Sequence, residues 1–202
     1  MRRLALIILS VGLAATVAHA QDKRVTVTFV PHNKNPNFDA ATDEYRRLWA
    51  AEGGRIILAM EQLSKLKFPH EDVKAEIYEG PSSSGVRFNR EGAPVGGSDP
   101  MRLRASYQAE EKKGTLTHEL GHRMNAQLKK RPQDVDEHRL LFLYLYDLYE
   151  NLYGKEFADR EVAFGKTLKG LYDYETAWNW ALAMSREERL SKFGEVLRAN
   201  RK

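Results

Sequence analysis

The chain contains no cysteine, and this absence excludes several classes of site at once. Without thiols there is no disulfide framework, no Cys-ligated metal centre and no thiol nucleophile. The chain also lacks any long block of like charge, because its 32 basic and 28 acidic residues are interspersed. The one short basic run, at 128–132, is typical of a solvated helix end. We therefore expect no nucleic-acid partner.

Long apolar runs are missing as well, except at the N-terminus. Arg2 and Arg3 precede an apolar stretch at 4–17, and Ala-His-Ala follows at 18–20. This order is typical of a cleaved secretory signal peptide. The apolar stretch is also shorter than the roughly 20 residues of a membrane-spanning helix. We expect residues 1–20 to be removed, the protein to be periplasmic or secreted, and no stable membrane insertion to remain.

The rest of the chain, residues 21–202, has a length that suits one domain. Its first part predicts strands and one long helix, whereas the part after residue 109 predicts helices only. The expected strands are at 24–30, 73–80 and 101–108, and the long helix is at about 41–67, with Gly53-Gly54 as a candidate break. Strands first and helices afterwards predict an α+β fold with a small mixed sheet and a mainly helical C-terminal half.

The sequence GTLTHELGHRMN at 114–125 contains the pattern H-E-x-x-H. Because each residue of a helix advances by about 100°, His118 and His122 lie one turn apart on the same face. Zinc held by two histidines and a third ligand keeps a position for water and lowers the pKa of that water to about 7. Glu119 lies beside the histidines, where it can take the proton of that water. The motif therefore predicts a zinc-dependent hydrolase.

An alternating strand at 101–108, a short loop and the helix LTHELGHRMN together resemble the core of the zincin metallopeptidases. The resemblance implies that His118 and His122 are zinc ligands and that Glu119 is the general base. It also implies a zincin-like fold in which the edge strand lines the cleft and pairs with an extended peptide or protein substrate. The expected function is that of an exported zinc peptidase. The alternative is a zincin-fold module that binds zinc or a protein without catalysis.

The third ligand does not follow a common zincin spacing, because positions 125 and 128 are Asn and Leu and positions 141 and 142 are Leu and Phe. We predict His138, near the start of the next helix on an apolar face. Glu137, Asp147 and Glu150 stay open as alternatives. Glu137 also fits the N3 position of a capping box that begins at Asp134.

Two further roles are left open by the sequence. Tyr172, Tyr174 and Arg123 are candidates for the donor that stabilises the oxyanion, and the pattern does not choose among them. Asp147 occurs in a helix that is apolar nearly all round, so it must be paired if it is buried. Both a hydrogen bond to a ligand histidine and a position on the surface are compatible with the sequence.

Overall fold

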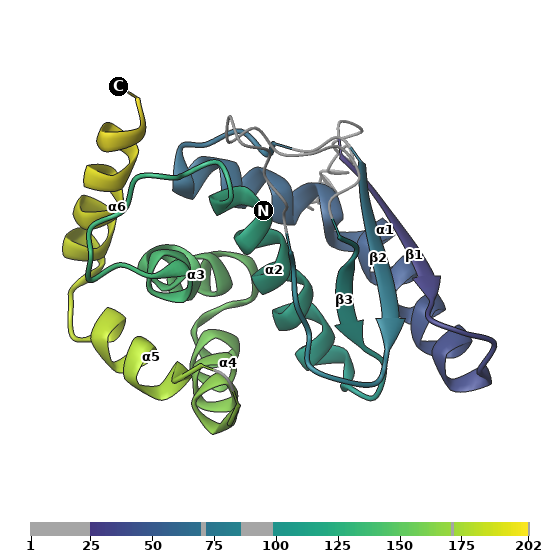
Figure 1. Cartoon of the computed structure of the whole chain (residues 1–202). Helices are drawn as coiled ribbons and strands as arrows, with labels where there is room; N and C mark the ends of the chain where they lie inside the picture. Colours follow the sequence, from purple (N-terminus) through teal and green to yellow (C-terminus); the bar gives the residue numbers. More distant parts are fainter. Residues whose placement is uncertain (1–24, 70–71, 86–98, 171, 202) are drawn as a thin grey trace, which may run out of the picture.

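The computed structural model describes residues 25–69, 72–85, 99–170 and 172–201, so the predicted signal peptide lies outside the described residues. The described residues form a mixed α+β fold of three strands and six helices, as predicted (Figure 1). The strands are β1 (Thr26–Pro31), β2 (Asp72–Tyr78) and β3 (Met101–Arg104). The helices are α1 (Pro36–Ser64), α2 (Ala109–Asn125), α3 (Glu137–Tyr153), α4 (Lys155–Thr167), α5 (Tyr174–Leu182) and α6 (Arg186–Asn200).

The three strands form a parallel sheet in the order β1-β2-β3. Buried and exposed residues alternate along each strand, so that Val73, Ala75 and Ile77 of β2 point into the core. α1 contacts β1 and β2 and covers this apolar face. The prediction of a mixed sheet is wrong for the named strands. Within the described residues, the antiparallel pairing is limited to an isolated bridge between Ser83 and Arg102.

That bridge changes the role of the strand before the HELGH helix. The Ser83 amide donates to the Arg102 carbonyl at 3.0 Å, and the Arg102 amide donates back at 2.8 Å. β3 therefore lies between β2 and the segment around Ser83, and it ends at Arg104. The prediction of an edge strand before the HELGH helix is confirmed, but the strand is shorter than the expected 101–108, and the bridge to Ser83 covers its outer edge at Arg102.

The long helix is also more continuous than predicted. α1 runs through Gly53-Gly54 without a break. A Cβ atom on Gly53 would stand 2.6 Å from the ring of Trp49, so this glycine makes room for an aromatic side chain. Its role in the sequence is packing and not termination.

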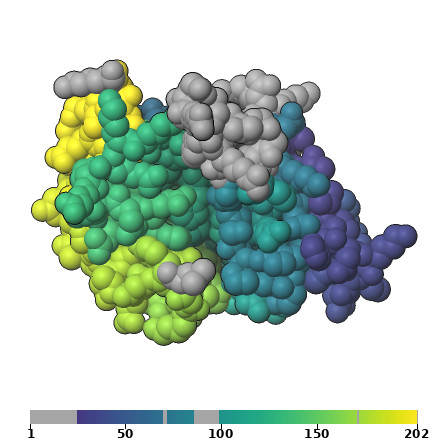
Figure 2. All heavy atoms as spheres, viewed as in Figure 1, coloured from purple at the N-terminus to yellow at the C-terminus, as the bar shows by residue number. Residues whose placement is uncertain are grey.

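α3 is the centre of the helical half, and it contacts α1, α2, α4, α5 and α6. It ends at Tyr153, and its C-cap residue Gly154 has a positive φ of 87°. The N-terminal elements and the C-terminal helices lie on opposite sides of the molecule (Figure 2), and α2 stands between them (Figure 1). One hydrophobic core nevertheless contains residues from β1 through α6. In the described part of the chain, no helix has both the length and the hydropathy needed to cross a membrane.

Candidate metal centre

The HELGH helix α2 and the following helix α3 approach each other closely at a glycine. A Cβ atom on Gly121 would stand 2.5 Å from Leu141 Cδ1, so residue 121 can carry no side chain unless α3 moves away. Leu141 lies three residues after His138, and residues three apart share a helix face. The missing side chain at Gly121 therefore lets α3 hold His138 against α2.

Two tyrosines of α3 fix the register of this packing. The Tyr144 hydroxyl donates to Asn125 Oδ1 at 3.1 Å, and the Tyr149 hydroxyl donates to the Gly114 carbonyl at 3.0 Å. Because Tyr144 contacts the C-terminal end of α2 and Tyr149 a residue nearer its N-terminus, the two helices pack antiparallel. His138, at the N-terminal end of α3, consequently meets the C-terminal half of α2.

Three imidazoles converge where these helices meet. The Nε2 atoms of His118 and His122 are 2.9 Å apart. The ring of His138 lies 5.6 Å from the ring of His118 and 4.7 Å from that of His122, centroid to centroid. One ring nitrogen from each histidine falls within 4.8 Å of the other two. The structure therefore brings together the three residues that the sequence named as ligands.

The donor set fits a zinc ion. A tetrahedral zinc with Zn–N distances of about 2.0–2.1 Å requires ligand nitrogens that are roughly 3.3 Å apart. The separations within the cluster span this value, with 2.9 Å for the closest pair and 4.8 Å as the upper limit. Three neutral nitrogen ligands are also a common zinc set, which leaves a fourth position for water.

The electrostatics of the cluster keep His118 and His138 neutral, as metal ligands must be. Burial lowers the pKa of His118 well below its ordinary value, and the proximity of His122 and His138 lowers it further. Burial and His122 likewise lower the pKa of His138 to about 4, although Glu137 and Asp136 oppose the shift. The Nε2 atoms of His118 and His122 share a hydrogen bond at 2.9 Å, and a cation bound at the cluster would take the place of its proton.

Glu119 is buried beside the imidazoles, with 5% of its surface exposed. Burial raises the pKa of its carboxyl to about 7, and Glu137 raises it too, while His122 and Arg123 oppose the shift. Its Oε2 atom has no hydrogen-bond partner among the described residues. Because a buried polar atom without a partner is costly, such an atom usually marks a position for water, an ion or a substrate.

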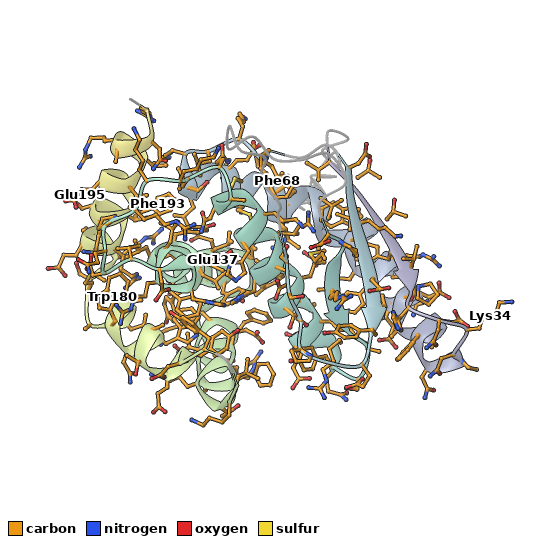
Figure 3. All side chains as sticks on the ribbon, viewed as in Figure 1. Lys34, Phe68, Glu137, Trp180, Phe193 and Glu195 are labelled. Carbon is orange, nitrogen blue, oxygen red and sulfur yellow. The ribbon has the colours of Figure 1, made fainter. Side chains whose placement is uncertain are left out.

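Glu137, which is the first residue of α3 and is labelled in Figure 3, contacts His122. Its Oε1 atom lies 3.3 Å from Nδ1 of His122, which is the opposite side of the ring from the Nε2 atom that faces His118. A carboxylate in this position orients a ligand histidine and does not itself bind the metal. The prediction that Glu137 belongs to a capping box is wrong, because α3 begins at Glu137 and its N-cap is Asp136.

Two aromatic residues of the predicted set cover His138. The ring of Tyr172 stacks on the imidazole at 4.1 Å, and its hydroxyl donates to both carboxylate oxygens of Asp136. The ring of Tyr174 lies 4.8 Å from His138, and its hydroxyl has no hydrogen bond among the described residues. The contact with Asp136 was not anticipated, because a residue at a helix N-cap carries no sequence signal for a partner 36 residues away.

The other residues considered for the site are engaged elsewhere. Arg123 is 1% exposed, and its Nη2 atom donates to the Asp99 carbonyl at 2.8 Å. Asp147 is buried and accepts a hydrogen bond from Arg189 Nη2 at 2.7 Å, nine residues or about 13.5 Å beyond His138 along α3. The prediction that Asp147 is paired if it is buried is confirmed. The two roles left open, a bond to a ligand histidine and a surface position, are both wrong. Neither Asp147 nor Glu150 belongs to the cluster that the described residues form.

Comparisons with protein-family models, with curated proteins and with solved structures find no match to this chain. The assignment of the site therefore rests on the geometry of His118, Glu119, His122 and His138 and on the chemistry that these side chains have in common with zincins.

Proposed function

We propose that this chain is an exported zinc-dependent peptidase, with His118, His122 and His138 as ligands and Glu119 as the general base. The observation that carries the proposal is the convergence of three imidazole nitrogens within 4.8 Å next to a buried carboxyl whose Oε2 atom has no partner among the described residues. Histidines clustered only for packing would not need ring nitrogens that converge on one point, and they would not need an unpaired carboxylate beside them.

When bound, zinc would supply a Lewis acid and a water of lowered pKa. Glu119 would accept a proton from the attacking water and pass it to the leaving amine. The pKa of Glu119, raised to about 7 by burial, suits a group that must both accept and release a proton near neutral pH. Glu137 would hold the ring of His122 through Nδ1, so that Nε2 stays directed into the cluster.

Tyr174 is our candidate for the donor that stabilises the oxyanion. The hydroxyl of Tyr172 donates to Asp136, and Arg123 donates to the Asp99 carbonyl, so both donors already have a hydrogen-bond partner. We expect Tyr174→Phe to lower kcat by on the order of 100-fold, as for the loss of one such donor. Tyr172→Phe is the matched control. It keeps the ring that stacks on His138 and should have a much smaller effect.

The proposed substrate is an extended peptide. The sequence predicted that it would pair with the strand at 101–108, but the structure suggests a different edge. Because Ser83 occupies the outer edge of β3, a peptide strand can pair with the far side of the Ser83 segment instead. In an antiparallel pair, neighbouring residues direct their backbone groups to opposite sides. The backbone groups of Ser82 and Ser84 then point away from β3, and they make no backbone hydrogen bond among the described residues. This edge suits β-augmentation.

The first test is elemental analysis of the purified protein together with three variants. We expect about one zinc per chain in the wild type, a loss of zinc in His138→Ala, and retention in Glu137→Ala at saturating zinc. Glu119→Gln should keep zinc and lose peptide hydrolysis by a factor of about 100 to 10,000. Absence of zinc in the wild type after zinc is offered would overturn the proposal. Equal activity of wild type and Glu119→Gln on every substrate would instead favour a zinc-binding module without catalysis.

A further inference from the structure

A second buried carboxyl close to the cluster has no evident partner. Glu161 of α4 is 9% exposed, and it makes no hydrogen bond or ion pair with any described residue. Apart from Glu119, the other buried acids in the described chain are paired, since Asp147 binds Arg189 and Glu61 binds Lys67. Leaving a carboxylate buried without a partner is costly, so the position of Glu161 requires an explanation.

The chain makes room for this carboxyl next to the proposed metal ligands. The Glu161 carboxylate fills the space that a Cβ on Gly114 of α2 would take. Gly114 lies four residues before His118, and side chains four apart on a helix have Cβ atoms about 5–6 Å apart. Glu161 thus lies about one helical turn from His118, on the same side of α2. It is too far to be part of the histidine cluster and near enough to contact a substrate held there.

The groups around Glu161 favour a cation. Phe164 follows it by three residues on the same face of α4, and the Phe164 ring meets the Tyr107 ring edge-on at 5.6 Å. Glu110 and Glu111 add negative potential from α2, and Arg160 is the basic group that opposes them. A carboxylate beside aromatic rings is the combination that binds ammonium and guanidinium groups, through a charged hydrogen bond and a cation–π contact.

We propose that Glu161 selects substrates with a cationic group close to the scissile bond, either a Lys or Arg side chain or a free α-ammonium. This inference rests on the proposed peptidase function. Residues of an extended peptide advance by about 3.3 Å, so the first or second residue from the scissile bond can reach a group one helical turn from His118. Burial raises the pKa of Glu161 to about 8, with Glu111 and Glu110 adding to the shift. At pH 7 the carboxyl therefore holds a proton, which it releases when a cation binds.

The test uses short alanine peptides with either lysine or norleucine at each position in turn, each with a free and an acetylated N-terminus. Norleucine keeps the length of lysine and removes its charge. For the wild type we expect a preference of 10-fold or more in kcat/KM for a cationic peptide, as for a hydrogen bond to a charged group. Glu161→Gln should remove this preference through KM and leave the norleucine peptides within about 2-fold. The acetylated series distinguishes a side-chain amine from an α-ammonium.

A binding measurement separates this inference from the proposed function. Calorimetric titration of Glu119→Gln protein with the same lysine and norleucine peptides requires no turnover. We expect the lysine peptide to bind more tightly than the norleucine peptide and its binding to release a proton. The double variant Glu119→Gln/Glu161→Gln should show no such proton release. Glu156→Gln, which changes an exposed acid in the first turn of α4, is the matched control and should retain the preference. Equal binding of lysine and norleucine peptides, or an unchanged preference in Glu161→Gln, would overturn the inference, whereas failure of hydrolysis alone would count against the peptidase proposal.

Discussion

Two polar groups of α3 differ in the kind of partner that they have. Near the middle of the helix, Asp147 is paired with Arg189 of α6 at 2.7 Å, and Arg186 lies 3.9 Å away. At the N-terminal end, His138 joins His118 and His122 in a cluster of three imidazoles that could hold a metal ion. The ion pair joins two helices inside the fold, whereas the cluster brings together side chains that can bind a cation.

Under the proposed function, the difference separates a structural role for Asp147 from a metal-binding role for His138 on the same helix. Charges that stabilise a fold are paired inside it, and breaking such a pair is costly. Groups that bind a ligand are held by their surroundings but left without a partner at the position that the ligand takes. Tyr172, Glu137 and Gly121 hold the histidines from outside, and none of them occupies the centre of the cluster.

The largest effect should come from breaking the ion pair. Asp147→Ala leaves the Arg189 guanidinium buried without a counterion, and we expect it to lower the free energy of unfolding by about 3–5 kcal/mol. Chemical denaturation measures the loss. Asp147→Leu/Arg189→Met is the control, and it should recover most of the stability because neither charge remains. Loss of zinc from folded Asp147→Ala protein would contradict the separation of the two groups.

A smaller effect should come from loosening the support of the cluster. Glu137→Ala removes the carboxylate that contacts His122 Nδ1, and we expect zinc to bind 10- to 100-fold more weakly while the fold is retained. Competition with a chromophoric chelator measures the affinity. Glu150→Ala, at a partly exposed position later on α3, is the control and should bind zinc as the wild type does. Complete loss of zinc in either variant would point to a carboxylate ligand.

The buried carboxyl of Glu161 should make stability depend on pH. Its pKa is about 8 in the folded protein and 4.5 for an ordinary glutamate, so the folded state holds an extra proton between these values. Stability from this group is therefore present in full below pH 4.5, falls by up to about 1 kcal/mol per pH unit as the pH rises to 8, and is level above that. Denaturation of wild type and Glu161→Gln from pH 5 to 9 checks this, and parallel curves would refute it.

The smallest effect should be a slight gain in the free energy of unfolding, whereas Asp147→Ala should cause a loss. Glu119→Gln replaces a buried carboxyl with an uncharged group of the same shape, so the metal-free protein should be as stable as the wild type or up to about 1 kcal/mol more stable at pH 8. Thermal unfolding after chelation is the measurement. A loss of several kcal/mol, as expected for Asp147→Ala, would mean that Glu119 supports the fold and would remove the contrast between the two groups.

Local patterns in the sequence predicted the parts of the site that depend on helix geometry. The spacing of His118 and His122 defines their common face, and the apolar face of α3 predicted that His138 would point inward. The parts that were missed depend on contacts between distant segments. Arg189 is 42 residues from Asp147, and Ser83 is paired with Arg102 from a segment rich in Ser and Gly that lacks strand periodicity. Gly53 was read as a break because its packing on Trp49 is not visible in composition.

The position of His138 at the start of α3 has a consequence for the lifetime of the protein. The segment 126–136 joins α2 to α3, and residues 129–134 of this segment are exposed. An ion held by His122 on one side and His138 on the other would tie the two ends of this loop together. Local opening of the first turn of α3 would then require release of the ion, and ligand binding suppresses such opening by mass action. If the chain binds zinc as proposed, the supply of zinc would decide how long it survives in the presence of proteases.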